Sequence, residues 1–106
     1  MKKIECIIRP EKVDEVIDAV QAIGVRGVTL TEVKGCGKET RTGDSLNALP
    51  KTKVEIFVAN GQVDEIVAAI IDFSKTGSFG DGKISIIPMD HVVRIRTNEE
   101  DEQAIY

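Results

Sequence analysis

The sequence has few of the residues that stack on nucleic-acid bases, bind metals or form disulfides. It contains no Trp, one Tyr and three Phe, so a base-stacking surface is not expected. One His and two cysteines thirty residues apart provide neither a zinc-ligand cluster nor a disulfide framework. Cys36, in a glycine-flanked stretch, is expected to be a plain reduced thiol, with a redox or modification site as the alternative.

Long apolar runs and basic runs are also missing. No stretch approaches the roughly 18 apolar residues that span a bilayer, and no apolar leader precedes the first charged segment, so we expect a cytoplasmic protein without membrane insertion. A net charge of -4 without a basic run argues against nucleic acid as a partner. The 106 residues are expected to form one domain, residues 1–106, small enough that oligomerisation would stabilise it.

Hydrophobic periodicity predicts alternating strands and helices. A period of two favours strands, and apolar residues at helical spacing favour two amphipathic helices. A stretch of about sixteen residues, 35–50, has no period and is longer than a simple connection, which is typical of a functional or disordered loop. The acidic end from Asn98 onward is expected to be mobile. The expected strands are 3–8, 25–33, 51–58 and 84–87, and the expected helices are 11–23 and 62–75.

The two halves of the chain resemble each other at an offset of fifty residues. Strand residues such as Lys3 and Glu5 meet Lys53 and Glu55, and the helical residues that follow match at the same offset. Each half reads strand-helix-strand, so the fold class is expected to be α+β, a ferredoxin-like βαββαβ arrangement with a four-stranded antiparallel sheet under two helices. One face of such a sheet is open, and its apolar residues, Ile7 among them, favour burial by oligomerisation.

A glycine-rich loop runs from Thr76 to Lys83. Three glycines in six residues let the backbone approach a ligand and turn its N–H groups toward it, and the lysine adds positive charge, which suits phosphate. The segment matches most of a nucleoside-triphosphate P-loop, but no Ser or Thr follows Lys83 and a strand, not a helix, comes next. A glycine turn that only ends a helix is the alternative.

Several segments together resemble the PII signal-transduction protein family. The resemblance covers nearly the whole chain and implies a homotrimer with adenine nucleotides bound in clefts between subunits. It also implies a long T-loop, about residues 36–51, that docks on a target protein, and a tail of about residues 98–106. The segments that carry it are 1–10, 25–29, 32–35, 49–51, 53–56, 76–77, 80–84 and 93–97.

The resemblance also implies roles for individual residues. One group would bind the nucleotide, with Thr29 near the adenine and the two arginines reaching the phosphates from the adjoining subunit. Glu39 and Lys51 would form the region of a second effector and a cation. No prosthetic group is implied; ATP, ADP or AMP would be the ligand, with Mg²⁺ as a possible companion ion. The nucleotide-binding group comprises Thr29, Gly35, Gly37, Lys38, Gly80, Asp81, Gly82, Lys83, Arg94 and Arg96.

The chain departs from the family pattern around its long loop. Lys38 stands where the family usually has Arg, and Glu39 where it usually has Gln, so a carboxylate would repel an anionic oxoacid. The loop is short and lacks a tyrosine. These departures favour a divergent PII-like branch associated with carboxysome and inorganic-carbon genes, with bicarbonate as second effector. The alternative is a conventional PII nitrogen regulator that senses ATP and 2-oxoglutarate.

Two further classes of function remain as alternatives. A weak ATPase could use Asp81, Glu39 and Lys51 near phosphate, but the residue that would hold magnesium after Lys83 is missing. A metal-binding trimer on the same fold lacks a ligand cluster. We therefore expect a regulatory protein and not an enzyme.

Overall fold

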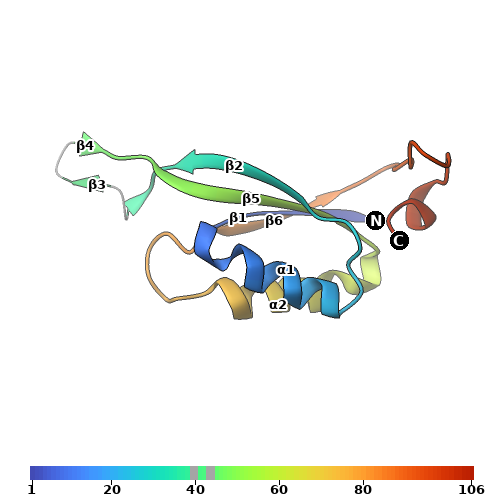
Figure 1. Cartoon of the computed structure of the whole chain (residues 1–106), viewed down its shortest axis with the longest axis horizontal. Coiled ribbons are helices and arrows are strands. Elements are labelled where there is room, and N and C mark those ends of the chain that lie inside the picture. The colour runs from blue at the N-terminus through green and yellow to red at the C-terminus, as the bar shows by residue number, and fades with distance from the viewer. Residues whose placement is uncertain (39–40, 43–44) are drawn as a thin grey trace.

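The computed structural model describes residues 1–38, 41–42 and 45–106, and between residues 41 and 46 only the backbone. Four antiparallel strands form one layer, in the order β2-β5-β1-β6, and two helices cover one of its faces (Figure 1). This is the predicted ferredoxin-like βαββαβ fold. Its elements are β1 (Lys2–Ile8), α1 (Val13–Ala22), β2 (Thr29–Gly35), β5 (Leu49–Val58), α2 (Val63–Ser74) and β6 (Lys83–Pro88).

The hydrophobic core lies between the sheet and the helices. Alternate residues of the two central strands point toward the helices and are buried, as the period of two predicts. The helices contribute residues at helical spacing to the same cluster. The residues with the least exposed side chains are Ile4, Cys6, Ile8, Val16, Val20, Val54, Ile56, Val58, Ile66 and Ile70.

The structure repeats with the offset seen in the sequence. A short 3-10 turn, η1 (Pro10–Lys12), leads into α1, and a second, η3 (Asn60–Gln62), leads into α2. The residues before these turns, Arg9 and Ala59, have nearly the same backbone angles. Because both helices begin fifty residues apart on equivalent turns, the two halves position their helices in the same way on the sheet.

The second predicted strand is wrong at its start. Residues 25–28 are not in a strand, and β2 begins at Thr29. Gly24, with φ of 104°, ends the helix, and the Val25 amide donates to the Val20 carbonyl at 3.1 Å. Val25 is therefore buried as part of the helix end, and its β-branched side chain gave a misleading strand signal.

The stretch 35–50 contains more regular structure than its lack of period suggests. β2 continues to Gly35, β5 already begins at Leu49, and two short strands, β3 (Arg41–Thr42) and β4 (Ser45–Leu46), pair as a separate hairpin. The hairpin projects from one end of the sheet (Figure 1). Glu39 lies outside the described residues.

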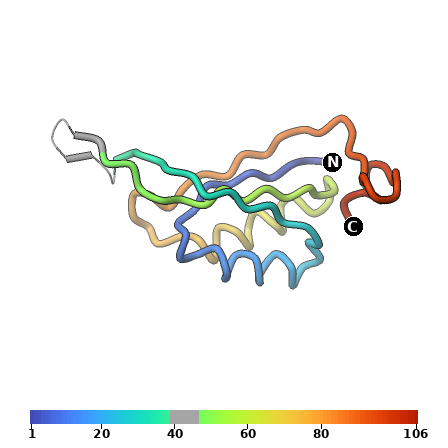
Figure 2. Tube along the Cα trace, turned by 45° about the horizontal axis from the view of Figure 1, so that its top comes forward, coloured from blue at the N-terminus to red at the C-terminus, as the bar shows by residue number. Residues whose placement is uncertain are grey.

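The C-terminal segment lies at the other end of the sheet, away from the hairpin (Figure 2). Where the sequence suggests a mobile tail, the structure has a 3-10 turn, η4 (Asp101–Ala104), and a bridge between Val93 and Glu100. The open face of the sheet carries Ile7 and Phe57, each about two-fifths exposed. No helix in the described part of the chain is both long and apolar enough to cross a membrane.

Candidate functional site

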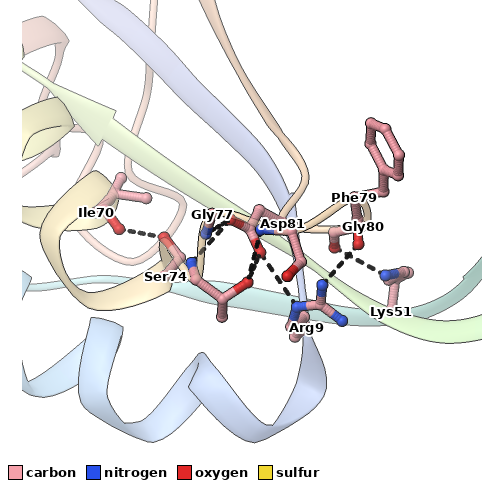
Figure 3. A network of polar contacts seen from close by, with 10 residues as sticks. Arg9, Lys51, Ile70, Ser74, Gly77, Phe79, Gly80 and Asp81 are labelled. Atoms are coloured by element: carbon pink, nitrogen blue, oxygen red, sulfur yellow. Dashed lines mark hydrogen bonds and ion pairs between the residues drawn. The ribbon is translucent and has the colours of Figure 1, made fainter. Parts of the chain in front are cut away.

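Asp81 organises the glycine loop from within. One of its carboxylate oxygens accepts hydrogen bonds from the amides of Thr76 and Gly77, both at 2.8 Å. The other accepts from the Thr76 hydroxyl at 2.5 Å and from Arg9 Nε at 3.3 Å (Figure 3). The Thr76 bonds, followed by those of Gly77 and Arg9, hold the pKa of Asp81 well below its usual range. The carboxylate is therefore ionised and directed at its own loop.

Arg9 and Lys51 fix the loop to the sheet. Arg9, just after β1, also donates through Nη2 to the Phe79 carbonyl at 2.7 Å. Lys51, a buried residue of β5, donates to the Gly80 carbonyl at 2.9 Å (Figure 3). Arg9 and Lys51 thus each donate a hydrogen bond to one of two successive carbonyls, those of Phe79 and Gly80, which turns the carbonyl oxygens toward the sheet.

Gly82 brings the loop against β1. Its φ is 101°, a conformation that favours glycine, and a Cβ there would lie 1.7 Å from the Ile7 carbonyl oxygen. No flexible side chain can yield at that contact, because the nearest atoms belong to the backbone of β1. Only glycine fits this position.

A hollow of about 640 Å³ lies beside the loop, and we call it the lysine hollow. It brings together most of the residues predicted to bind the nucleotide. Three lysines and no carboxylate are among its described lining residues, although the chain as a whole is acidic. The hollow therefore suits an anion. Its lining comprises Ile7, Gly35, Cys36, Gly37, Lys38, Lys51, Phe79, Gly80, Gly82 and Lys83.

Phe79 and Lys38 meet across the mouth of the lysine hollow. The Lys38 ammonium lies 5.3 Å from the centre of the Phe79 ring, a cation–π contact. Phe79 is two-thirds exposed, and its ring points away from the loop's hydrogen-bond network (Figure 3). The pair joins the glycine loop to the stretch that leaves β2.

Thr29 and Arg94 line a different hollow, of about 440 Å³, at the other end of the sheet. We call it the tail hollow, because the C-terminal segment forms one of its walls. The Arg94 guanidinium donates to the Glu99 carboxylate at 2.9 Å and to the carbonyls of Ala104 and Tyr106. The complete lining is Arg26, Gly27, Val28, Thr29, Glu55, Phe57, Arg94, Ala104, Ile105 and Tyr106.

The two hollows are too far apart for one subunit to form the whole predicted site. Thr29 and Gly35 are the first and last residues of β2, so the strand rise separates them by about 20 Å. Arg96, the second arginine, is exposed near the Arg94 end. The predicted residues thus form two groups, which a single chain does not bring together.

Sequence reasoning assigned no individual role to Arg9, Thr76 or Phe79, although Thr76 and Phe79 lie within the loop predicted to bind phosphate. Arg9 could have been noticed in the sequence, because the equivalent position in the second half of the chain, fifty residues later, is Ala59. A charged residue in one half and a small apolar residue in the other depart from the internal repeat. Thr76 lies five residues before Asp81, a spacing that lets a carboxylate accept from the amides that follow a helix. Phe79 had no such signal in the sequence, since a single aromatic residue in a loop has no periodicity.

Comparisons with known proteins agree with the family resemblance seen in the sequence. The sequence model of the family described as nitrogen regulatory protein P-II matches residues 1–99. The chain is 47% identical to the nitrogen regulatory protein P-II of Rhizobium etli, with 99% of this chain and 100% of the relative covered. It is 46% identical to nitrogen regulatory protein P-II 2 of Methanothermobacter thermautotrophicus (99% and 97% covered) and 39% identical to nitrogen regulatory protein GlnK of Escherichia coli K12 (99% and 100% covered).

These matches correct one expectation. The relatives are nitrogen regulatory proteins, so the expected placement in a divergent, inorganic-carbon branch is wrong, and bicarbonate as an effector has no support. The expectation of a regulatory protein, not an enzyme, is confirmed by the family. The chain belongs to the P-II nitrogen regulatory protein family.

Proposed function

We propose that this chain is a nitrogen regulator whose three subunits bind adenine nucleotides at their interfaces and signal to a protein target through residues 36–51. The separation of the lysine hollow from the tail hollow is the observation that carries this proposal. A nucleotide would have its phosphates in the lysine hollow of one subunit and meet Thr29, Arg94 and Arg96 of the next. The cytoplasm is the expected location.

The chemistry of the lysine hollow suits a polyphosphate. Lys38, Lys51 and Lys83 supply positive charge, and the glycines allow close approach of the backbone. Asp81 has a positioning role in this account, because its carboxylate already accepts four hydrogen bonds from the loop and Arg9. Mg²⁺ would accompany the phosphates, and the family resemblance assigns Glu39 to the region that holds the cation.

For the second effector, the relatives favour 2-oxoglutarate, the alternative given above, over bicarbonate. All three relatives described are named as nitrogen regulatory proteins. Lys51, the residue matched to the oxoacid site, lines the lysine hollow together with Lys38, and both add positive charge that suits a dicarboxylate. The carboxylate of Glu39 opposes that binding by charge, so a weakened response to 2-oxoglutarate is expected.

Calorimetric titration with ATP, ADP and AMP, each with and without 2-oxoglutarate or bicarbonate, tests the function. We expect nucleotide binding, weak enhancement by 2-oxoglutarate and none by bicarbonate. The Glu39→Gln variant should bind 2-oxoglutarate about tenfold more tightly in the presence of ATP and Mg²⁺, because a like charge is removed. A second charge-neutralising variant, Glu11→Gln on η1, serves as control. Absence of nucleotide binding would refute the proposal.

Cys36 offers a second, chemical test. It is exposed and lines the lysine hollow, whereas Cys6 is buried in β1, where burial raises the pKa of its thiol to about 11. We expect a thiol-alkylating reagent at neutral pH to label Cys36 and to leave Cys6 unlabelled, as mass spectrometry of the intact protein would report. Saturating ATP should slow labelling of Cys36 about tenfold or more by covering it. Equal labelling with and without ATP would place the nucleotide elsewhere.

A further inference from the structure

The C-terminal segment occupies the arginine that the proposed nucleotide site needs. Both terminal nitrogens of Arg94 donate to tail oxygens, Nη1 to Glu99 and Nη2 to the carbonyls of Ala104 and Tyr106. The Arg94 side chain is only about one-quarter exposed in this arrangement. Carboxylate and carbonyl oxygens here take the donors that phosphate oxygens would otherwise take.

The same segment also walls the hollow in which the rest of that half-site lies. Ala104, Ile105 and Tyr106 line the tail hollow opposite Thr29 and Phe57. A ligand that enters between Thr29 and Arg94 must therefore share this space with the tail. The tail therefore obstructs the nucleotide in two ways: it takes the hydrogen-bond donors of Arg94, and it fills part of the tail hollow.

Apart from the contacts with Arg94, the contacts between side chains that attach the tail are exposed. His91 pairs with Asp101 at 2.9 Å and with Glu100 at 3.5 Å, and the Tyr106 hydroxyl donates to Gln62 at 2.5 Å. Exposed side-chain contacts of this kind contribute little, so the outer part of the tail is a local unit of low stability. Two of its residues, Asn98 and Asp101, have φ of 61° and 56°, which adds backbone strain to the docked form. A ligand can displace such a segment.

We infer that residues 99–106 act as an internal competitor of nucleotide: docked on Arg94 they close the half-site, and nucleotide binding releases them. This inference rests on the proposed function. The fraction of molecules with a docked tail sets how much nucleotide binding is weakened. The apparent affinity for nucleotide is the intrinsic affinity multiplied by the fraction of molecules whose tail is released. A tail docked in about nine molecules of ten would weaken nucleotide binding about tenfold.

The experiment compares two variants with the same charge change on the same segment. Glu99→Gln removes the ion pair with Arg94, whereas Glu102→Gln, on η4, neutralises an exposed carboxylate for which the described structure gives no side-chain bond. Gln62→Ala is a second release variant, remote from Arg94, that removes the partner of the Tyr106 hydroxyl. Each protein is titrated calorimetrically with ATP, and hydrogen exchange of residues 98–106 is measured with and without ATP.

We expect Glu99→Gln to bind ATP about five- to tenfold more tightly than the unmodified protein, Gln62→Ala to show a smaller gain, and Glu102→Gln to show none. ATP should accelerate exchange of the Asp101 amide, which the docked tail protects by a hydrogen bond to the Val92 carbonyl. Equal ATP affinities in all four proteins with unchanged exchange would overturn the inference and leave the proposed function standing. Absence of ATP binding in every protein would overturn both.

Discussion

Replacing Gly82 with alanine is expected to displace the glycine loop from the sheet and to remove nucleotide binding. The added Cβ would lie 1.7 Å from the Ile7 carbonyl oxygen, and the φ of 101° is unfavourable for any residue with a side chain. Backbone strain and overpacking each cost about 1–3 kcal/mol, so we expect a loss of about 3 kcal/mol in the free energy of unfolding. Urea unfolding and ATP titration measure the two effects.

Alanine substitutions at two other glycines distinguish the cost of an unfavourable φ from the cost of a steric clash. A Cβ at Gly77 would meet nothing within 4 Å, but φ there is 88°, so Gly77→Ala carries the conformational cost alone, about 1–2 kcal/mol. Gly61, in η3, has open space and no unusual φ, so Gly61→Ala should change stability by about 0.5 kcal/mol or less. If Gly82→Ala were no worse than Gly77→Ala, the close approach of the loop to β1 would not matter.

Replacing Asp81 with asparagine is expected to open the loop while keeping its size. An amide has only one oxygen to offer the four donors that the carboxylate now accepts from, and its NH₂ group would face N–H and O–H donors. Arg9 also loses its anionic partner. We expect ATP to bind about tenfold more weakly or worse, because the amides and carbonyls of the loop are no longer held in place.

The same variant has a distinctive pH dependence. Because hydrogen bonds lower the pKa of Asp81 in the folded protein, its carboxylate stabilises the fold above the unfolded-state pKa of about 3.9. That contribution is lost as pH falls from there toward the lowered pKa. The difference in Tm between the unmodified protein and Asp81→Asn should therefore be full near neutrality and shrink below about pH 4.

Asp72→Asn, an exposed change on α2, provides the matched control for Asp81→Asn. Its effect on Tm should be small, because the side chain is exposed. A Tm difference for Asp81→Asn that stayed constant from neutral to acid pH would contradict the role assigned to the Asp81 carboxylate.

The fold was largely predictable because the same physical pattern occurs twice in the chain. Apolar residues alternate in β1 and β5 and recur at helical spacing in α1 and α2, and these residues form one buried core. The fifty-residue offset relates the first half of the chain to the second. The exceptions have local causes. Val25 has a β-branched side chain but is held at a helix end, and the stretch around β3 and β4 pairs as a hairpin without hydrophobic periodicity.

The chemistry of the lysine hollow was predictable from its residue types, but the arrangement of those residues was not. The glycines and lysines of the lysine hollow have recognisable phosphate chemistry, yet nothing in the sequence shows that Asp81 turns inward or that Arg9 reaches across to it. Likewise, the tail is expected to be mobile because of its acidic composition, and its hydrogen bond to Gln62 joins residues that are remote in the chain. Such contacts leave no local pattern.

Mixing two binding-deficient variants tests most directly whether each nucleotide site is shared between subunits. Lys83→Ala damages the lysine hollow and Arg94→Ala damages the tail hollow, so each protein alone should bind ATP poorly while remaining trimeric. If the two are unfolded and refolded together in equal amounts, random assembly of a cyclic trimer should restore about a quarter of the sites. Calorimetric titration that recovers this fraction at the original affinity is the predicted result. No recovery, with mixed trimers demonstrated by native mass spectrometry, would contradict a site formed between subunits.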